Sequence, residues 1–204
     1  MENGSFYEGT SMPGRNWWAA MFGDPAAILR TLGICPDMTV LDLCCGDGYF
    51  TAPLASMVTG RVYALDLDGA LIERAKAEVA RQGLQIAKWM VADARQADVL
   101  LPEHVDYVLM TNTFHGVDDR PALVATMVRC LNEGGRVGLL NWQTRSREET
   151  IVMGQPRGPA TELRMPPADA AANLEQGGFT IERIVNVPPY HYGVVARLSG
   201  ELSL

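Results

Sequence analysis

The chain has 204 residues, of which 48% are apolar and 20% charged, the usual composition of one globular domain with a full core. Its 17 Lys and Arg residues against 24 Asp and Glu residues give a net charge of −7, which disfavours polyanionic partners such as DNA and RNA. No apolar run approaches the ~18 residues of a membrane span, and the 4 cysteines lack the paired spacing of zinc ligands.

The first residues of the chain also lack the basic start and apolar segment of a secretion signal. We therefore expect a cytoplasmic protein with reduced thiols, no bound metal, and neither a nucleic acid nor a membrane as partner. We expect it to act as a monomer or a homodimer.

Helical and strand patterns alternate along the chain, separated by turn residues. The predicted helices cover residues 24–33, 49–58, 68–83, 118–131 and 169–176, and the predicted strands cover residues 40–43, 61–65, 86–91, 105–110, 136–141, 179–187 and 193–198. This alternation predicts an α/β fold with a doubly wound, mostly parallel sheet. The Pro188-Pro189 turn predicts that the last two strands form a hairpin.

The most informative motif follows the first predicted strand and reads Asp-Leu-Cys-Cys-Gly-Asp-Gly over residues 42–48. Gly46 and Gly48 allow the backbone to approach a ligand closely before the next helix begins. A dinucleotide fingerprint requires a third glycine or alanine, and Thr51 occupies that position. Asp66, at the end of the second strand, has the chemistry to accept hydrogen bonds from two ribose hydroxyls. The pattern indicates a ribose-containing ligand without a pyrophosphate.

Residues 42–48, Asp66 and the later Ala92-Asp93-Ala94 resemble three successive motifs of the class I S-adenosylmethionine-dependent methyltransferases. The chain departs from the family pattern at Cys44, where the first motif usually has glycine. The resemblance extends from about Val40 to Asn141. It implies a single seven-stranded Rossmann-like sheet with an antiparallel last strand, and S-adenosyl-L-methionine as cofactor.

The resemblance also implies roles for individual residues. The candidate cofactor-binding residues are Asp42, Cys44, Gly46, Gly48, Asp66, Leu67, Asp93, Ala94 and Asn112. Asp93 would accept a hydrogen bond from the adenine amino group, whereas Asp68 is more typical of a helix cap.

Two histidines are candidates for the catalytic base, because an unperturbed imidazole has a pKa near ~6.5. They are His115, which follows the fourth strand, and His191 on the final hairpin. A structural histidine that contacts a loop carbonyl remains the alternative for each. The candidate substrate-contacting residues are Trp17, Phe114, Trp142, Arg157 and Tyr190.

Two segments are expected to shape the specificity for the methyl acceptor. Residues 1–34 resemble the helical lid that covers a methyltransferase domain, which here would comprise residues 35–204. Within that domain, residues 142–167 resemble a substrate-side insertion. Arginines 145, 147, 157 and 164 of this insertion could hold a carboxylate or a phosphate of the acceptor, or could form a solvated ion-pair surface.

Taken with the resemblance, the sequence predicts methyl transfer to the nucleophilic atom of a small molecule. A non-catalytic S-adenosylmethionine-binding protein is one alternative, and a nicotinamide-dependent oxidoreductase is another.

Overall fold

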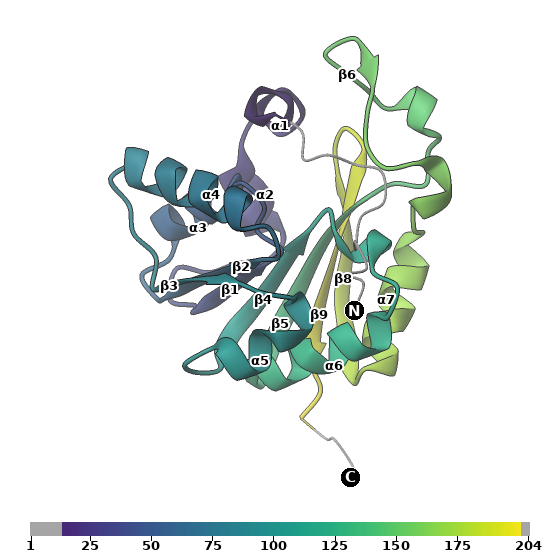
Figure 1. The fold of residues 1–204 in the computed structure, drawn as a ribbon. Helices are drawn as coiled ribbons and strands as arrows, with labels where there is room; N and C mark the ends of the chain where they lie inside the picture. Colours follow the sequence, from purple (N-terminus) through teal and green to yellow (C-terminus); the bar gives the residue numbers. More distant parts are fainter. Residues whose placement is uncertain (1–13, 201–204) are drawn as a thin grey trace, which may run out of the picture.

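The computed structural model describes residues 14–200. The first 13 residues of the predicted lid, and residues 201–204, lie outside that range. The fold is a layered α/β arrangement in which helices cover both faces of one large sheet (Figure 1).

The large sheet has seven strands in the order β3-β2-β1-β4-β5-β9-β8. Its strands are β1 (Val40–Leu43), β2 (Val62–Asp66), β3 (Lys88–Val91), β4 (Val105–Thr111), β5 (Leu131–Trp142), β8 (Phe179–Val187) and β9 (His191–Leu198). The strands from β3 to β5 pair in parallel, and β9 runs antiparallel to both β5 and β8. This topology confirms the predicted class I methyltransferase fold.

The helices are α1 (Arg15–Met21), α2 (Pro25–Thr31), α3 (Thr51–Met57), α4 (Gly69–Arg81), α5 (Ala97–Leu100), α6 (Arg120–Cys130) and α7 (Pro167–Gln176). Three of them begin as the sequence predicts. The carboxylates of Asp24, Asp68 and Asp119 accept hydrogen bonds from backbone N–H groups in the first turns of α2, α4 and α6. Asp68 is therefore a helix cap.

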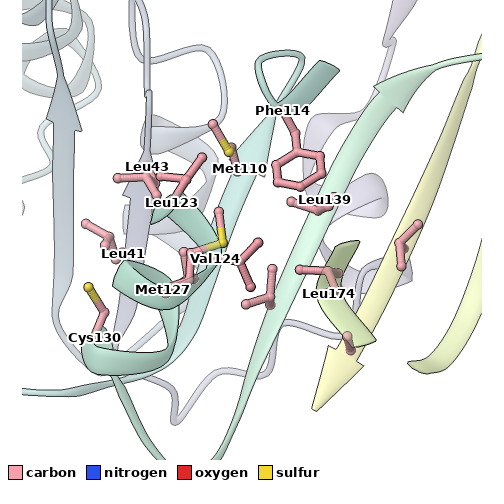
Figure 2. Packing of buried hydrophobic residues seen from close by; sticks show 14 of the residues in the cluster. Leu41, Leu43, Met110, Phe114, Leu123, Val124, Met127, Cys130, Leu139 and Leu174 are labelled. Atoms are coloured by element: carbon pink, nitrogen blue, oxygen red, sulfur yellow. The ribbon is translucent and has the colours of Figure 1, made fainter. Parts of the chain in front are cut away.

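The two faces of the sheet bury two separate apolar layers. Leu41 and Leu43 of β1 pack with Leu123 and Met127 of α6 on one face (Figure 2). Val40 faces the opposite way, into a layer that contains residues of α1, α2 and α3. Because successive side chains of a strand point to opposite faces, Asp42 lies on the same side as Val40 and faces α3.

Residues 142–167 form the least regular part of the chain. They contain the short hairpin of β6 (Ile151–Val152) and β7 (Gln155–Pro156), with one-turn helices at Arg147–Glu149 and Thr161–Leu163. β6 contacts α1, and Figure 1 shows both at the same end of the molecule. Between residues 14 and 200, the helices are all too short and too polar to traverse a lipid bilayer.

Candidate functional site

A cavity of about 1110 Å³ lies at the carboxyl ends of the parallel strands. In α/β sheets this is the edge where ligands bind. The residues after β1, β2, β3 and β4 form one part of its wall, and residues of α1 and of the segment that follows β5 form another. No cluster of His, Cys, Asp or Glu side chains within residues 14–200 could hold a metal ion.

The turn after β1 supports this cavity with three residues in the left-handed backbone region. Cys44 has φ +61°, Gly46 φ +56° and Gly48 φ +77°. Cys44 occupies the position where the family pattern has glycine, and its φ value explains that preference. Cys44 and Gly46 line the cavity. Gly48 does not, and a Cβ atom there would lie 2.8 Å from the Cβ of Ala75, so its role is close packing against α4.

Asp42 is buried beneath the turn and does not line the cavity. Its Oδ2 accepts a 2.6 Å hydrogen bond from the Thr51 hydroxyl, and its Oδ1 has no hydrogen-bond partner. Burial raises the pKa of Asp42 to about 7, although the Thr51 hydrogen bond opposes this shift. Asp42 therefore organises the turn from below and, unlike the prediction of a direct cofactor contact, does not reach the cavity in this structure.

Asp66 lies at the cavity wall where β2 ends. Its Oδ2 accepts a hydrogen bond of 2.8 Å from the Gly46 N–H, and its Oδ1 accepts one of 2.9 Å from the Asp68 N–H. Burial raises the pKa of this carboxyl, and the two backbone hydrogen bonds lower it. The adjacent Leu67 is 54% exposed and also lines the cavity, so an apolar surface lies beside the carboxylate.

Asp93 and Ala94 also line the cavity, after β3. The Asp93 carboxylate accepts hydrogen bonds from Nε and Nη2 of Arg95, at 3.0 and 2.6 Å, and this pairing lowers its pKa. Arg95 is a wall residue that sequence reasoning did not identify. Its position two residues after a candidate acidic ligand was the available signal.

His115 and Asn112 lie at the cavity wall after β4. Asn112 has φ +57°, a backbone conformation that asparagine tolerates better than most residues. The Nδ1 atom of His115 lies 3.4 Å from Oδ1 of the buried Asn141. Burial lowers the pKa of His115 to about 4, and the nearby charges of Arg164 and Arg120 contribute to this shift. The imidazole is therefore neutral at physiological pH.

Three other predicted site residues do not line the cavity. His191 has no exposed surface, and its ring packs between Phe22 and Trp142, at centroid distances of 4.6 and 4.3 Å. Both of its ring nitrogens lack a hydrogen-bond partner, and burial lowers its pKa well below 6.5. His191 therefore packs as a core residue in this structure, which differs from the position expected of the predicted catalytic base.

Phe114 and Tyr190 are the other two. Phe114 is fully buried and extends toward Leu139 in the core (Figure 2). Tyr190 stacks on Trp142 at 6.4 Å and donates a hydrogen bond to the carbonyl oxygen of Ile151. Both were predicted to contact the substrate. The structure instead gives Phe114 a packing role, while Tyr190 supports the outer side of Trp142 and the β6–β7 hairpin.

Trp17 and Trp142 line the cavity, together with Trp18 and Tyr49, which the sequence did not single out as site residues. The rings of Trp17 and Trp18 meet edge to face at 4.6 Å, and Trp17 lies 5.9 Å from Trp142. Helix α1 thus contributes an aromatic wall to the cavity.

Arg15 attaches helix α1 to the turn after β1. Its guanidinium donates a hydrogen bond to the carbonyl oxygen of Asp47, lies 3.6 Å from the Asp47 carboxylate and 3.3 Å from that of Glu78, and sits 5.6 Å from the Tyr49 ring centre. This contact connects the start of α1 with α4.

The arginines after β5 divide into two groups. Arg147 and Arg157 line the cavity, whereas Arg145 and Arg164 do not. Arg164 is buried, with its guanidinium 5.0 Å from the centre of the Trp142 ring, and it donates hydrogen bonds to Thr150 Oγ1 and to the Arg157 carbonyl oxygen.

The order of the sheet, and a cavity at its carboxyl edge, are the features of class I methyltransferases. Residues 40–135 match the methyltransferase domain family. The chain therefore contains a class I S-adenosylmethionine-dependent methyltransferase domain.

Curated relatives resemble only part of the chain. It is 34% identical to a 2-phytyl-1,4-naphtoquinone methyltransferase of Nostoc punctiforme over 124 residues, which are 57% of this chain and 52% of the relative. It is 44% identical to a 23S rRNA (uracil(1939)-C(5))-methyltransferase of Xanthomonas oryzae over 68 residues, 33% of this chain and 15% of the relative. The chain thus spans about half of the first protein and under a sixth of the second.

Solved structures share the fold over most of the chain. An S-adenosylmethionine-dependent methyltransferase from Aquifex aeolicus superposes with a TM-score of 0.76 at 24% identity, covering 92% of this chain and 94% of that one. Magnesium protoporphyrin IX methyltransferase from Synechocystis, solved with bound S-adenosylmethionine, gives a TM-score of 0.63 at 18% identity, covering 90% of each chain.

Proposed function

We propose that this protein transfers a methyl group from S-adenosylmethionine to a nucleophilic atom of a small molecule, in the cytoplasm, as a monomer or homodimer. The observation that carries the proposal is one cavity with two chemically different ends. Asp66 and Leu67 form part of one end, and Trp17 and Arg157 form part of the other. Its volume of about 1110 Å³ suits a cofactor together with a compact second molecule.

The residues of the first end fit the adenosyl part of the cofactor. A carboxylate has about four lone-pair sites, and Asp66 uses two of them for backbone N–H groups. The remaining acceptor capacity lets the carboxylate accept hydrogen bonds from the ribose hydroxyls. The exposed side chain of Leu67 provides an apolar surface for the adenine ring, and Asp93 keeps acceptor capacity on Oδ2, which binds only one Arg95 nitrogen.

S-adenosylmethionine supplies, when bound, a methyl group on a positively charged sulfur. The protein must then hold the acceptor atom ~3 to 3.5 Å from that carbon and in line with the bond that breaks. The aromatic wall of Trp17, Trp18 and Trp142 would exclude water from this region. We propose that residues 1–34 form a lid and that helix α1 is the part of this lid that keeps water out of the cavity.

The role of His115 depends on the acceptor. It lines the cavity in its neutral form, so it can accept a hydrogen bond or a proton from a hydroxyl or amine nucleophile. A pKa of about 4 makes it a weak base, so orienting the acceptor is the role that this conformation favours. A thiolate or metalloid acceptor would need no base.

A small acceptor, in preference to RNA, is supported by the net charge of −7 and by the aromatic enclosure of the cavity. The naphtoquinone methyltransferase of Nostoc punctiforme matches the chain over 124 residues, and a ubiquinone/menaquinone biosynthesis C-methyltransferase of Shewanella halifaxensis matches it over 117. The rRNA methyltransferase of Xanthomonas oryzae matches it over 68.

Calorimetric titration tests the cofactor assignment. S-adenosylmethionine and S-adenosylhomocysteine should bind, and NADH should not. Asp66→Asn should weaken S-adenosylhomocysteine binding about tenfold or more, because hydrogen bonds to a charged acceptor are worth ~1.5 to 3 kcal/mol. The exposed Asp118, changed to Asn, is the matched control. Equal affinity for the wild type and the Asp66→Asn protein would refute the assignment.

Release of S-adenosylhomocysteine during incubation with a metabolite library then tests for catalysis. A compound that supports turnover by the wild type, and whose turnover falls in His115→Gln, would support the proposed site. Tight cofactor binding without turnover on any compound, or turnover on an RNA substrate alone, would argue against small-molecule transfer.

A further inference from the structure

Three hydrogen-bond donors on residues of the cavity wall have no partner in the described part of the fold. They are the indole N–H groups of Trp17 and Trp18 and the Nε–H of Arg157, all on residues that line the cavity. Each of these nitrogens is buried, and none has a hydrogen-bond partner among residues 14–200. Since a buried polar group without a partner is costly, this grouping of unpaired donors is unusual.

The positively charged side chains at the end of the cavity that includes Arg157 also lack carboxylate partners in the part of the chain that the structure describes. Of the four arginines between residues 145 and 164, Arg147 and Arg157 reach the cavity, and no carboxylate of the described residues lies within 4.0 Å of their guanidinium groups. Every other arginine wall residue lies toward the cofactor end: Arg95 pairs with Asp93, and Arg74 lies on α4. Unpaired positive charge therefore collects on the side where the acceptor would enter.

Arg157 is held in place by the backbone around it. Its N–H donates to the Thr150 carbonyl oxygen at 2.9 Å, and its own carbonyl oxygen accepts hydrogen bonds from Thr150 Oγ1 and Arg164 Nη2, at 2.7 and 3.0 Å. Arg164 is only 6% exposed and its Nη1 has no partner. It thus braces the Arg157 backbone and adds a second buried positive charge.

The segment lies directly against the aromatic wall. A Cβ atom on Gly158 would be 3.0 Å from ring atoms of Trp142 and 2.9 Å from Arg164 Nη2, so the chain passes over the indole at contact distance. The Arg147 Nε–H donates to the Gly158 carbonyl oxygen at 3.1 Å, which connects the second cavity arginine to the same turn. The two arginines and the tryptophans therefore border one compartment.

We infer that the methyl acceptor is a planar, apolar molecule with an anionic oxygen group, a carboxylate or a phosphate monoester, that Arg157 and Arg147 bind. This inference rests on the proposed function and names the chemical class of its acceptor. The tryptophan rings contact the planar body, and the guanidinium of Arg157 offers paired N–H donors to the anion.

The test uses three probes of the same shape: 2-naphthoate, 2-naphthyl phosphate and the neutral 2-naphthamide. Each is titrated calorimetrically into protein saturated with S-adenosylhomocysteine. We expect one of the two anions to bind at least tenfold more tightly than the amide, and the identity of that anion distinguishes carboxylate from phosphate. Equal affinities for all three probes would overturn the inference.

The variants Arg157→Gln and Arg157→Lys show whether the arginine is responsible. The first should remove the preference for the anion, and the second should keep part of it, because lysine retains the charge but not the planar pair of donors. Arg145→Gln is the matched control, since this exposed arginine belongs to the same segment and does not line the cavity. An anion preference that survives in Arg157→Gln would refute the assignment to Arg157.

S-adenosylhomocysteine binding is measured in the same samples before the probes are added. If the protein binds S-adenosylhomocysteine but does not discriminate between the probes, the acceptor inference fails and the proposed function stands. If it does not bind S-adenosylhomocysteine, the proposed function itself fails. A thermal melt of each variant shows whether it is folded, and Arg147→Gln, which changes an exposed side chain, provides a second test if Arg157→Gln is unfolded.

Discussion

Replacing Asp42 with asparagine should make the folded protein more stable at neutral pH. The carboxyl group is fully buried, its Oδ1 has no hydrogen-bond partner, and its pKa is raised to about 7 from 3.8. Asparagine has nearly the same shape, keeps an oxygen that can accept the Thr51 hydrogen bond, and carries no charge at any pH. The substitution therefore removes the cost of ionising a buried carboxylate, while the amide N–H groups at the unpartnered Oδ1 position add a smaller cost that does not change with pH.

The direction and size of the effect follow from proton linkage. Between pH 4 and pH 7, an unfolded chain has lost the Asp42 proton and the folded protein still holds it. The free energy of unfolding of the wild type therefore decreases as pH rises through this window, by about 1.36 kcal/mol per pH unit. From pH 5 to pH 8 the stability advantage of Asp42→Asn should grow by roughly 3 kcal/mol, with little further change above pH 8.

Urea unfolding at pH 5, 6, 7 and 8, without cofactor, measures this difference. His115, with its pKa lowered to about 4, contributes a slope of the opposite sign between pH 4 and 6.5, but it is present in both proteins and cancels. Asp118→Asn, at an exposed position, is the control and should show a constant difference. A difference between wild type and Asp42→Asn that stays constant within ~0.5 kcal/mol from pH 5 to pH 8 would refute the reasoning.

Substitutions at three further positions test packing and backbone strain. His191→Phe should keep stability within about 1 kcal/mol of wild type, because it removes two unpaired nitrogens from an aromatic cluster, whereas His191→Ala should lose about 3 kcal/mol; both are measured by urea unfolding. Cys44→Gly should change stability by less than about 1 kcal/mol, since relief of the left-handed φ is offset by glycine's greater flexibility, while the β-branched Cys44→Val should lose about 2 kcal/mol. Gly138→Ala should lower the melting temperature by roughly 6 to 12 °C, because its Cβ would lie within 2.8 Å of the Tyr107 ring and closer still to the hydroxyl oxygen. If Gly138→Ala kept the wild-type melting temperature, the close approach of Tyr107 to this strand would be contradicted. If Cys44→Val were as stable as the wild type, the backbone strain at Cys44 would be contradicted.

The parts of the fold that the sequence predicted are those in which one local signal decides the structure. Asp24, Asp68 and Asp119 cap the helices that they were predicted to begin. β1 is buried on both faces and was recognised from its apolar residues up to Leu43, although it also contains Asp42. Helix α5, at Ala97–Leu100, was missed because four residues are too few to show a helical period.

The predicted positions of His191 and Phe114 differ from the structure for a common reason. The direction in which each side chain points depends on neighbours that are distant in the sequence. The first six residues of β9, from His191 onward, are buried on both faces, so no alternation reveals which way His191 points. Phe114 lies in a single turn of 3-10 helix after β4, where one residue's rotation decides between core and cavity. In contrast, Asp66, Leu67 and Asp93 line the cavity at strand ends, where the family resemblance predicted cofactor-binding residues.

A net charge of −7 argues against a polyanionic partner but does not argue against a small anionic acceptor. A polyanion interacts with the whole acidic surface, whereas a small acceptor interacts mainly with the residues of the cavity. A long polyanion contacts much of the acidic surface at once, and repulsion adds up over many charges. A small acceptor touches few surface charges directly, and before it enters the cavity solvent-exposed charges more than ~8 Å away are largely screened at physiological ionic strength. There the adjacent guanidinium groups of Arg147 and Arg157 dominate the local potential, while Asp66 and Asp93 line the cofactor end. Raising the ionic strength should therefore not slow anion entry, because salt screens the repulsion from the acidic surface while the attraction acts only after the acceptor has reached the cavity.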